Sequence, residues 1–265
     1  MPPSFHSSPK ASPGRCSTSV RSPSSRCAGP RRTAPKRDPL LDHILDRHTN
    51  RTSFDLTRPV APSQLETIRA AARNPDLVYV NQALERAEKV QDITQRAWDA
   101  WIGYAPTREE VAHWTHVGNA AIAAAPYGPY VSDAALARAA GSVSFETLSD
   151  PSSAQFQANR TAYRRTVETG HAHLWIVSPA FDRKGMFEAG RDWVRVHLQA
   201  RALGLDMQPH SEALQDFQEL AADVRELHDA LGVAAPARIQ MLGRIGHRER
   251  VGPSPRLPAS AHIGV

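Results

Sequence analysis

One segment constrains the fold more than any other, because it carries the longest helical pattern of the chain together with a start and a stop signal. It runs from Asp182 to Leu205 and reads DRKGMFEAGRDWVRVHLQARALGL. Asp182 can accept hydrogen bonds from the first free N–H groups of a helix, and Gly204 can adopt the left-handed conformation that ends one. Apolar and small residues recur at spacings of three and four, which predicts a buried face: Met186, Ala189, Gly190, Trp193, Val196, His197, Ala200 and Leu203, widened by Val194 and Leu198. We expect the other side to face solvent: Glu188, Arg191, Asp192, Arg195 and Gln199.

Shorter patterns surround this central helix. Apolar runs predict strands at residues 77–80, 171–178 and 238–246. Helical spacing predicts helices at residues 38–45, 62–73, 82–101, 109–117 and 211–231, the last one capped by Ser211. Residues 118–160 show no clear pattern apart from a short helix near 133–140. The chain therefore contains both strands and helices.

The net charge of +5 is concentrated at the N-terminus. Residues 1–37 hold eight of the 32 basic residues and no acidic residue, which leaves 24 basic against 27 acidic residues in residues 38–265, the body. The first 37 residues are also rich in Ser and Pro and poor in large apolar residues, so we expect a disordered basic tail. The slightly acidic body does not suit nucleic-acid binding. Its length suffices for one domain with its own core.

Cysteine usage and hydropathy indicate a cytoplasmic protein. Both cysteines, Cys16 and Cys27, lie in the tail, so the body has no disulfide and no thiol nucleophile. No segment approaches eighteen consecutive apolar residues, so we expect no membrane partner.

Several strong catalytic signatures are absent from the sequence: GxxxxGK[ST], GxGxxG, GxSxG and HExxH. His171 and His173 share one face of a predicted strand, and His113 and His116 lie three apart in a helix, so either pair could hold a metal. Twelve histidines produce such spacings by chance. We therefore expect no metal site.

The sequence RHTNR at residues 47–51 indicates an anion site. Arg47 and Arg51 can converge on a phosphate through charge-assisted hydrogen bonds, with an imidazole and a hydroxyl between them. An ordinary charged helix end is the alternative. A second basic element returning from the far end of the chain would favour the anion site, and four arginines are available for it: Arg244, Arg248, Arg250 and Arg256.

Three segments resemble the nitroreductase superfamily, in the order of that family. RHTNRTSFDLTRPVAPSQLETIRAAA is similar to its phosphate-binding opening, EAGRDWVRVHLQARALGLDMQP to its central helix, and RIQMLGRIGHRERVGPSPRLP to its closing segment. Together they span most of residues 38–258. The similarity is greatest to the duplicated, dormancy-associated Acg-type proteins, in which the RHTNR element opens the second half.

This resemblance implies an α+β fold of the nitroreductase type, with a mixed sheet surrounded by helices, in residues 38–265. It also implies an FMN-dependent oxidoreductase that takes hydride from NAD(P)H and reduces nitro compounds or quinones. Arg47, His48, Thr49 and Arg51 would hold the phosphate and ribityl end of FMN. Arg256, and with it Arg244, would approach the phosphate from the C-terminal side. A homodimer, or pairing with a homologous half, would complete the site.

The chain departs from the family pattern after its first helices. Where the family carries an Ala-Pro-Ser-x-x-Asn-x-Gln-x-Trp-like segment at the flavin ring, this chain reads ARNPDLVYVNQ, with only Asn81 and Gln82 in suggestive positions. Two alternatives therefore remain open. The chain could bind or sequester flavin without efficient turnover, or it could be an incomplete interaction module. No residue is singled out as catalytic, because in this family the flavin supplies the chemistry.

Overall fold

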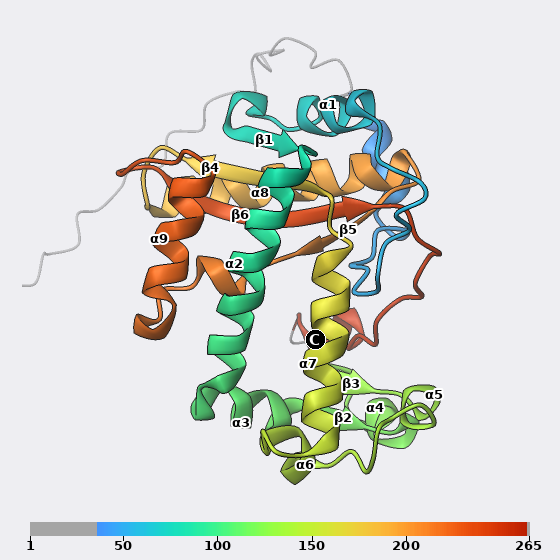
Figure 1. The fold of residues 1–265 in the computed structure, drawn as a ribbon. Coiled ribbons are helices and arrows are strands. Elements are labelled where there is room, and N and C mark those ends of the chain that lie inside the picture. The colour runs from blue at the N-terminus through green and yellow to red at the C-terminus, as the bar shows by residue number, and fades with distance from the viewer. Residues whose placement is uncertain (1–35, 264–265) are drawn as a thin grey trace, which may run out of the picture. The chain divides into compact units, whose positions relative to one another are not determined.

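The computed structural model describes residues 36–263. The predicted tail lies almost entirely outside the described residues, as do both cysteines. Residues 38–265 form one compact unit. The α-helices of this unit are α1 (Pro62–Ala70), α2 (Leu84–Gly103), α3 (Ala105–Trp114), α4 (Asn119–Ala124), α5 (Asp133–Leu136), α6 (Phe145–Ser149), α7 (Ala154–Glu168), α8 (Arg183–Ala202) and α9 (Ala221–Ala230). Figure 1 shows their arrangement.

A four-stranded antiparallel sheet forms the centre of the unit. Its strands are β1 (Val78–Asn81), β4 (Ala172–Ser178), β5 (Asp206–Pro209) and β6 (Arg238–Gly246), in the order β1-β4-β6-β5. Trp175 of β4 lies opposite Tyr79 on one side and Leu242 on the other, and Arg244 of β6 lies opposite Gln208 of β5. A separate parallel pair joins β2 (His116–Val117) to β3 (Tyr130–Val131). Five short 3-10 helices complete the described chain: η1 (Pro39–His43), η2 (Pro75–Leu77), η3 (Glu212–Leu214), η4 (Gln218–Leu220) and η5 (Ala259–Ala261).

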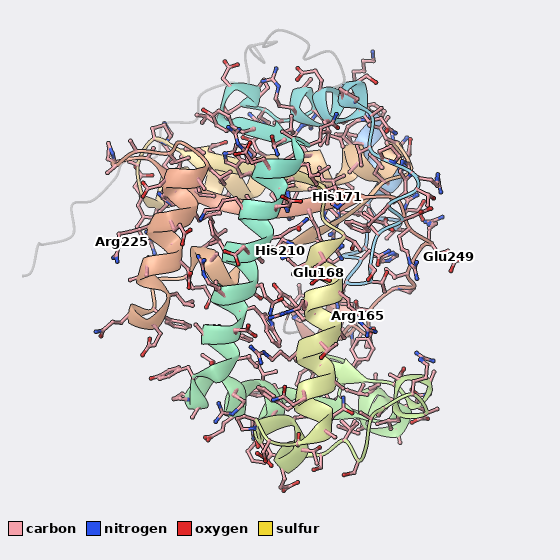
Figure 2. The ribbon with its side chains drawn as sticks, viewed as in Figure 1. Arg165, Glu168, His171, His210, Arg225 and Glu249 are labelled. Atoms are coloured by element: carbon pink, nitrogen blue, oxygen red, sulfur yellow. The ribbon has the colours of Figure 1, made fainter. Side chains whose placement is uncertain are left out.

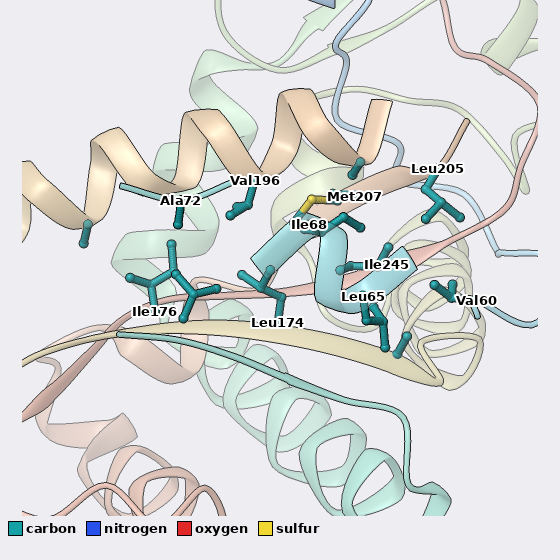
Figure 3. Packing of buried hydrophobic residues seen from close by; sticks show 14 residues of the cluster. Val60, Leu65, Ile68, Ala72, Leu174, Ile176, Val196, Leu205, Met207 and Ile245 are labelled. Atoms are coloured by element: carbon teal, nitrogen blue, oxygen red, sulfur yellow. The ribbon is translucent and has the colours of Figure 1, made fainter. Parts of the chain in front are cut away.

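Both faces of the sheet are covered, because β4 is buried along its whole length and its alternate side chains point to opposite faces. Leu174 and Ile176 pack with α1 and α8, in the cluster of Figure 3 that also contains Ile68 and Val196. Trp175 packs on the other face. The apolar cluster there is formed with α2 and α9: Val90, Ile93, Ala97, Leu227 and Leu231. The arrangement confirms the predicted α+β class and the three predicted strands.

The central helix is confirmed as α8. The Asp182 side chain accepts a hydrogen bond from the N–H of Gly185 at 2.6 Å, and Gly204 has φ of +75°. The prediction that Asp192 faces solvent was wrong, because this residue is only 2% exposed. Its carboxylate accepts hydrogen bonds from the backbone N–H of Arg73 and from the side chain of Asn74, and so holds the turn that follows α1. Met186 and Val194 of the predicted buried face are exposed instead.

Other predictions were wrong in part. The helix expected over residues 211–231 is divided into η3, η4 and α9, and Ser211 makes no capping hydrogen bond. Residues 38–45 form η1 rather than a longer helix. The strand β5 and the 15-residue helix α7 were not predicted. Both elements position the site described below.

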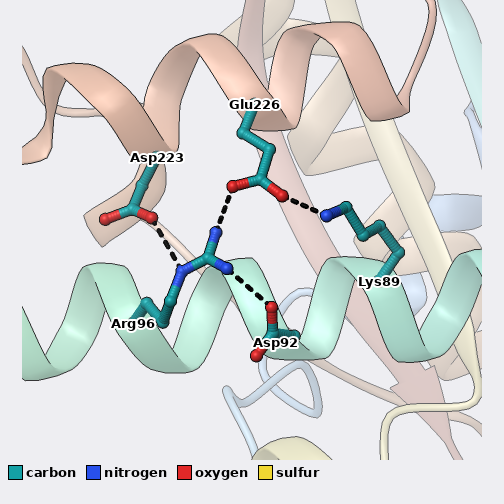
Figure 4. A network of polar contacts seen from close by, with 5 residues as sticks. All are labelled: Lys89, Asp92, Arg96, Asp223 and Glu226. Carbon is teal, nitrogen blue, oxygen red and sulfur yellow. Dashed lines mark hydrogen bonds and ion pairs between the residues drawn. The ribbon is translucent and has the colours of Figure 1, made fainter.

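Polar contacts join α2 to α9 across the outer surface. Arg96 contacts Asp92, Asp223 and Glu226, and Glu226 also pairs with Lys89 (Figure 4). Single exposed ion pairs contribute about 0–1 kcal/mol, so the buried cluster beneath them contributes most of the stability of this contact. No helix in residues 36–263 is long and apolar enough to cross a membrane.

Candidate anion site and its buried neighbours

The segment at residues 47–51 is fixed in place by Asn50. This side chain is fully buried and donates hydrogen bonds to the Asp206 carboxylate at 2.7 Å and to the Glu249 carbonyl at 3.1 Å. Its backbone N–H donates to the carbonyl of Met207, next to a bridge between Thr49 and Met207. The RHTNR segment is therefore held against the edge strand β5 and against the chain that follows β6.

The predicted site residues on this segment lie in different environments. Arg47 is half-buried and its Nη1 lies 3.4 Å from His197 Nδ1 of α8, so that nitrogen of the imidazole is the acceptor. Burial, with the nearby Arg47 charge, lowers the pKa of His197 to about 4. His48 and Thr49 are half-buried. Arg51 is exposed and forms no ion pair with any other residue in 36–263.

A second basic segment does return to this place from the far end of the chain. Glu249 receives the hydrogen bond of Asn50, and Arg250 pairs with Asp46 at 2.7 Å. Residues 249 and 250 thus lie beside the RHTNR segment. Arg256 is exposed, and the hydrogen bond that it donates goes to the carbonyl of its neighbour Pro255. The contacts of residues 47–51 therefore include the chain at 249–250 and not Arg256.

Arg244 has an interior position. It is fully buried, and its three donor groups go to Gln208 Oε1 at 2.9 Å, Thr169 Oγ1 at 3.0 Å and the Thr52 carbonyl at 2.5 Å. Burial lowers its pKa to about 9. With its donors bonded inside the protein, the surroundings of Arg244 give no support to the prediction that it binds an anion.

Sequence reasoning missed a buried cluster of ionisable groups beside this segment. Tyr163 of α7 stacks on Trp98 of α2, with ring centroids 4.5 Å apart. Its hydroxyl lies 3.5 Å from His210 Nδ1 and 3.5 Å from Glu212 Oε2. Tyr163 thereby extends from α7 toward His210, which is labelled in Figure 2. The sequence signal that could have indicated the helix α7 was the spacing of Phe156, Tyr163 and Val167, which fits one helical face.

Glu212 joins this cluster to the RHTNR segment. Burial raises the pKa of its carboxyl, while the backbone N–H groups of Glu212 and Ser211, the Tyr163 hydroxyl and Arg51 each act to lower it. Arg51 is therefore close enough to interact electrostatically with Glu212. The exposed Arg51 thus acts on Glu212 through its charge, without a direct hydrogen bond or ion pair in residues 36–263.

An apolar cavity of about 340 Å³ lies on the other side of residues 52–54. Phe54, Val60, Leu84 and Ile245 contribute its apolar walls, and Gln82 and His171 contribute polar groups. Asn81 does not line it, since its amide donates to the carbonyl of Ala83. Of the two suggestive residues, Gln82 alone lines this cavity.

Comparison with solved structures identifies the fold of this chain. A nitroreductase with bound FMN from Desulfitobacterium hafniense matches 86% of this chain and 97% of its own, with a TM-score of 0.51 and 13% identity. The FMN and NADPH-dependent nitroreductase NfnB from Sphigopyxis sp. strain HMH matches 84% of this chain and 96% of its own, with a TM-score of 0.51 and 17% identity. The chain has the nitroreductase fold. No protein-family model and no curated protein sequence matches it.

Within the nitroreductase fold, the N-terminal and C-terminal segments of the unit meet at β5, and the RHTNR residues lie at that junction. The hydrogen bonds of Asn50 to Asp206 and Glu249 create the junction. These partners are 156 and 199 residues away in sequence. The arrangement brings the cationic side chains of residues 47–51 close to the chain at residues 249–250.

Proposed function

We propose that this chain is an FMN-dependent NAD(P)H oxidoreductase of the nitroreductase type, which reduces nitro compounds or quinones. The observation that carries the proposal is the exposed guanidinium of Arg51, which forms no ion pair within residues 36–263, on a segment anchored by Asn50 in a chain with the nitroreductase fold. The two similar structures support it, because one is a nitroreductase with bound FMN and the other is an FMN and NADPH-dependent nitroreductase.

The residues present fit the phosphate end of FMN. A phosphate dianion requires several charged or polar donors, and Arg can supply two parallel N–H groups. Arg51 and the half-buried His48 and Thr49 provide donors of this kind on one short segment. Because Asn50 fixes the backbone, the segment loses little further backbone freedom on binding. We propose the same role for Arg256, which would have to move toward the segment when the phosphate binds.

When bound, FMN would supply the hydride transfer, and the protein would bind and orient it. Arg51 would hold the negative phosphate at the surface. The contact of Arg47 with His197 would orient the Arg47 guanidinium. The cavity at Phe54, three residues after the segment, offers a largely apolar surface. We assign no catalytic side chain from this arrangement alone.

We also propose that the chain pairs with a second copy or with a homologous half, as the similarity to the Acg-type proteins implies. Large apolar side chains are exposed on α8 and just before it, where a soluble surface would be expected to be polar. Phe187 is 65% exposed, and Phe181, Val194 and Met186 are 52%, 51% and 42% exposed. A second apolar surface would cover them.

The alternative of flavin binding without efficient turnover has a specific observation in its favour. The segment at residues 71–82 forms the end of α1, the helix η2 and the strand β1, and Asn81 is bonded to the neighbouring backbone. This segment therefore offers a ligand little beyond Gln82. The third reading, an interaction module, would leave the protein without flavin.

Purification of the protein with added FMN separates these readings. A yellow protein with an FMN spectrum is expected, and NADPH or NADH should bleach it under anaerobic conditions if the chain turns over. A bound flavin that no nicotinamide donor bleaches would indicate sequestration. A colourless protein that does not retain FMN on gel filtration would overturn the proposal.

A further inference from the structure

A cavity of about 260 Å³ lies between α2 and α7, and none of its lining residues belongs to the RHTNR segment. The two helices pack against each other and run side by side in Figure 1. The lining residues repeat at spacings of three and four along each helix, so each helix presents one face to the cavity. They include Glu88, Asp92 and Gln95 of α2, and Arg164, Val167 and Glu168 of α7. The cavity is smaller than the sites of drug-sized ligands, which measure about 300–1,000 Å³, and therefore suits a small molecule.

Gln95 is a buried amide without a partner at the wall of this cavity. It is 9% exposed, and neither Oε1 nor Nε2 forms a hydrogen bond within residues 36–263. Buried polar groups are normally bonded to protein, water or a ligand, because an unmade hydrogen bond is costly. Burial raises the pKa of the nearby Asp99, but Arg160 and the Gln95 amide lower it more, so it lies below its usual range. The amide nitrogen therefore faces Asp99 without bonding to it, and Oε1 is the acceptor left for a donor that enters the cavity.

Two carboxylates of the cavity have no basic partner in residues 36–263. These are Glu88 on α2 and Glu168 on α7. Asp92, by contrast, is paired with Arg96 at 2.7 Å, and Arg164 is directed to another carboxylate, 3.9 Å away. The cavity thus carries negative charge that the described residues do not neutralise.

We propose that this cavity binds the primary ammonium group of a small aliphatic amine. An alkylammonium has three N–H donors and no acceptor, which matches the carboxylates of Glu88 and Glu168 together with Gln95 Oε1. Val167 contributes an apolar surface for the alkyl chain. A calcium ion would require about six to eight oxygen ligands. No group of three or more histidine, cysteine or acidic residues within 36–263 could hold a metal ion.

Binding of n-butylammonium as the probe tests this proposal without flavin. In 15N-labelled protein, the side-chain amide signals of Gln95, assigned by their loss in Gln95→Met, should shift and saturate as the probe is added. Glu88→Gln and Glu168→Gln should each raise the Kd about tenfold or more, because each removes a charged acceptor. Glu110→Gln is the matched control on α3, away from the lining residues, and should leave the Kd unchanged. 1-Butanol has the same alkyl chain without the charge and should not compete.

A variant at Gln95 separates ligand binding from stability. Gln95→Met keeps a side chain of similar length and removes the amide. Calorimetric titration should show weaker binding of n-butylammonium to this variant. Its melting temperature should equal or exceed that of wild type, because the substitution breaks no hydrogen bond within the protein. A lower melting temperature together with unchanged affinity would show that the amide supports the fold and binds no amine.

Other results would also overturn the proposal. One is the absence of a saturable shift when n-butylammonium is added to wild type. Another is an unchanged Kd in both Glu88→Gln and Glu168→Gln, and a third is equally tight binding of 1-butanol. Saturation by Ca²⁺ or Mg²⁺ in place of the amine, lost in the same variants, would identify a metal site instead. Failure of the protein to bind FMN would overturn the proposed function and leave these measurements unaffected.

Discussion

The guanidinium of Arg244 lies over the ring of Phe54, with its central carbon 3.9 Å from the ring centroid. The two residues of this contact have different surroundings. Phe54 lines the apolar cavity, while Arg244 donates to Gln208, Thr169 and the Thr52 carbonyl behind it. Cation–π attraction of this kind is strongest when the cation is desolvated. The chain just after the RHTNR segment, at Thr52 and Phe54, is consequently held by a buried cation that pairs with no carboxylate of residues 36–263.

Replacement of Arg244 should therefore destabilise the protein strongly. Arg244→Met removes the Arg244 donor from Gln208 Oε1 and from the Thr52 carbonyl, while Thr169 Oγ1 still accepts from the Phe54 N–H. A hydrogen bond to a charged group contributes about 1.5–3 kcal/mol. We expect the free energy of unfolding to fall by at least about 3 kcal/mol in urea denaturation. The matched control is Arg256→Met at an exposed position, which should change the free energy of unfolding by no more than about 0.5 kcal/mol. Equal effects of the two changes would contradict the structural role of Arg244.

Replacement of Arg51 should weaken FMN binding specifically at the phosphate. Arg51→Ala is expected to cost about 1.5–3 kcal/mol, or roughly ten- to a hundredfold in Kd. Riboflavin lacks the phosphate, so its affinity should hardly change. Fluorescence titration of both ligands into variant and wild type measures this difference. Equal losses for the two flavins would show that Arg51 supports the fold and does not bind the phosphate.

Stability should fall as the pH drops below about 6.5. Burial depresses the pKa of His173 to about 3 in the folded protein, so between pH 6.5 and pH 3 the unfolded chain binds more protons. The stabilising contribution is present above the unfolded pKa and is lost toward the folded one. For one such histidine the loss from pH 7 to pH 5.5 is about 1 kcal/mol.

Urea denaturation at several pH values measures this effect. His173→Phe should flatten the dependence, and the exposed His262→Phe should leave it as in wild type. A wild-type protein equally stable at pH 7 and pH 5 would contradict the buried neutral state of His173.

Gly246 is required because the chain passes very close to Phe54 there. A Cβ at this position would lie 2.7 Å from Phe54 Cβ and closer still to the ring. Gly246→Ala should thus displace Phe54 and cost about 1–3 kcal/mol, as overpacking does. Gly252→Ala is the control, since nothing lies within 4 Å of its added carbon. Thermal melts of both variants test the difference, and an equally small effect at Gly246 would be inconsistent with this packing.

Self-association through α8 should depend on its exposed apolar residues. Sedimentation is expected to show a dimer at micromolar concentration, and Phe187→Glu should shift it toward monomer because a charge would be buried. Glu88→Lys, a charge change on α2, serves as a control. A wild-type monomer that binds FMN fully would remove the need for a shared interface.

Local patterns in the sequence predicted those helices and strands whose ends or buried faces are marked by their own residues. Asp182 and Gly204 mark the ends of α8 because capping is a local hydrogen-bonding property. The continuous apolar run from Leu174 to Val177 indicates a strand covered on both faces, which β4 is. The likeness of three segments to nitroreductases gave the fold class, which the structural comparison confirms.

Tertiary structure decided the positions that depend on distant partners. Asp192 has the spacing of a solvent-facing residue, yet it is buried because the turn after α1 supplies an N–H donor from 119 residues away. The strand β5 is too short to be recognised and exists because β6 pairs with it. The mostly polar α7 gave little periodic signal, although it carries Tyr163. The junction of Asn50 with Asp206 and Glu249, and the meeting of Tyr163 with His210 and Glu212, arise only when the chain closes on itself. Hydrogen bonds across such separations leave no periodic trace in a single sequence.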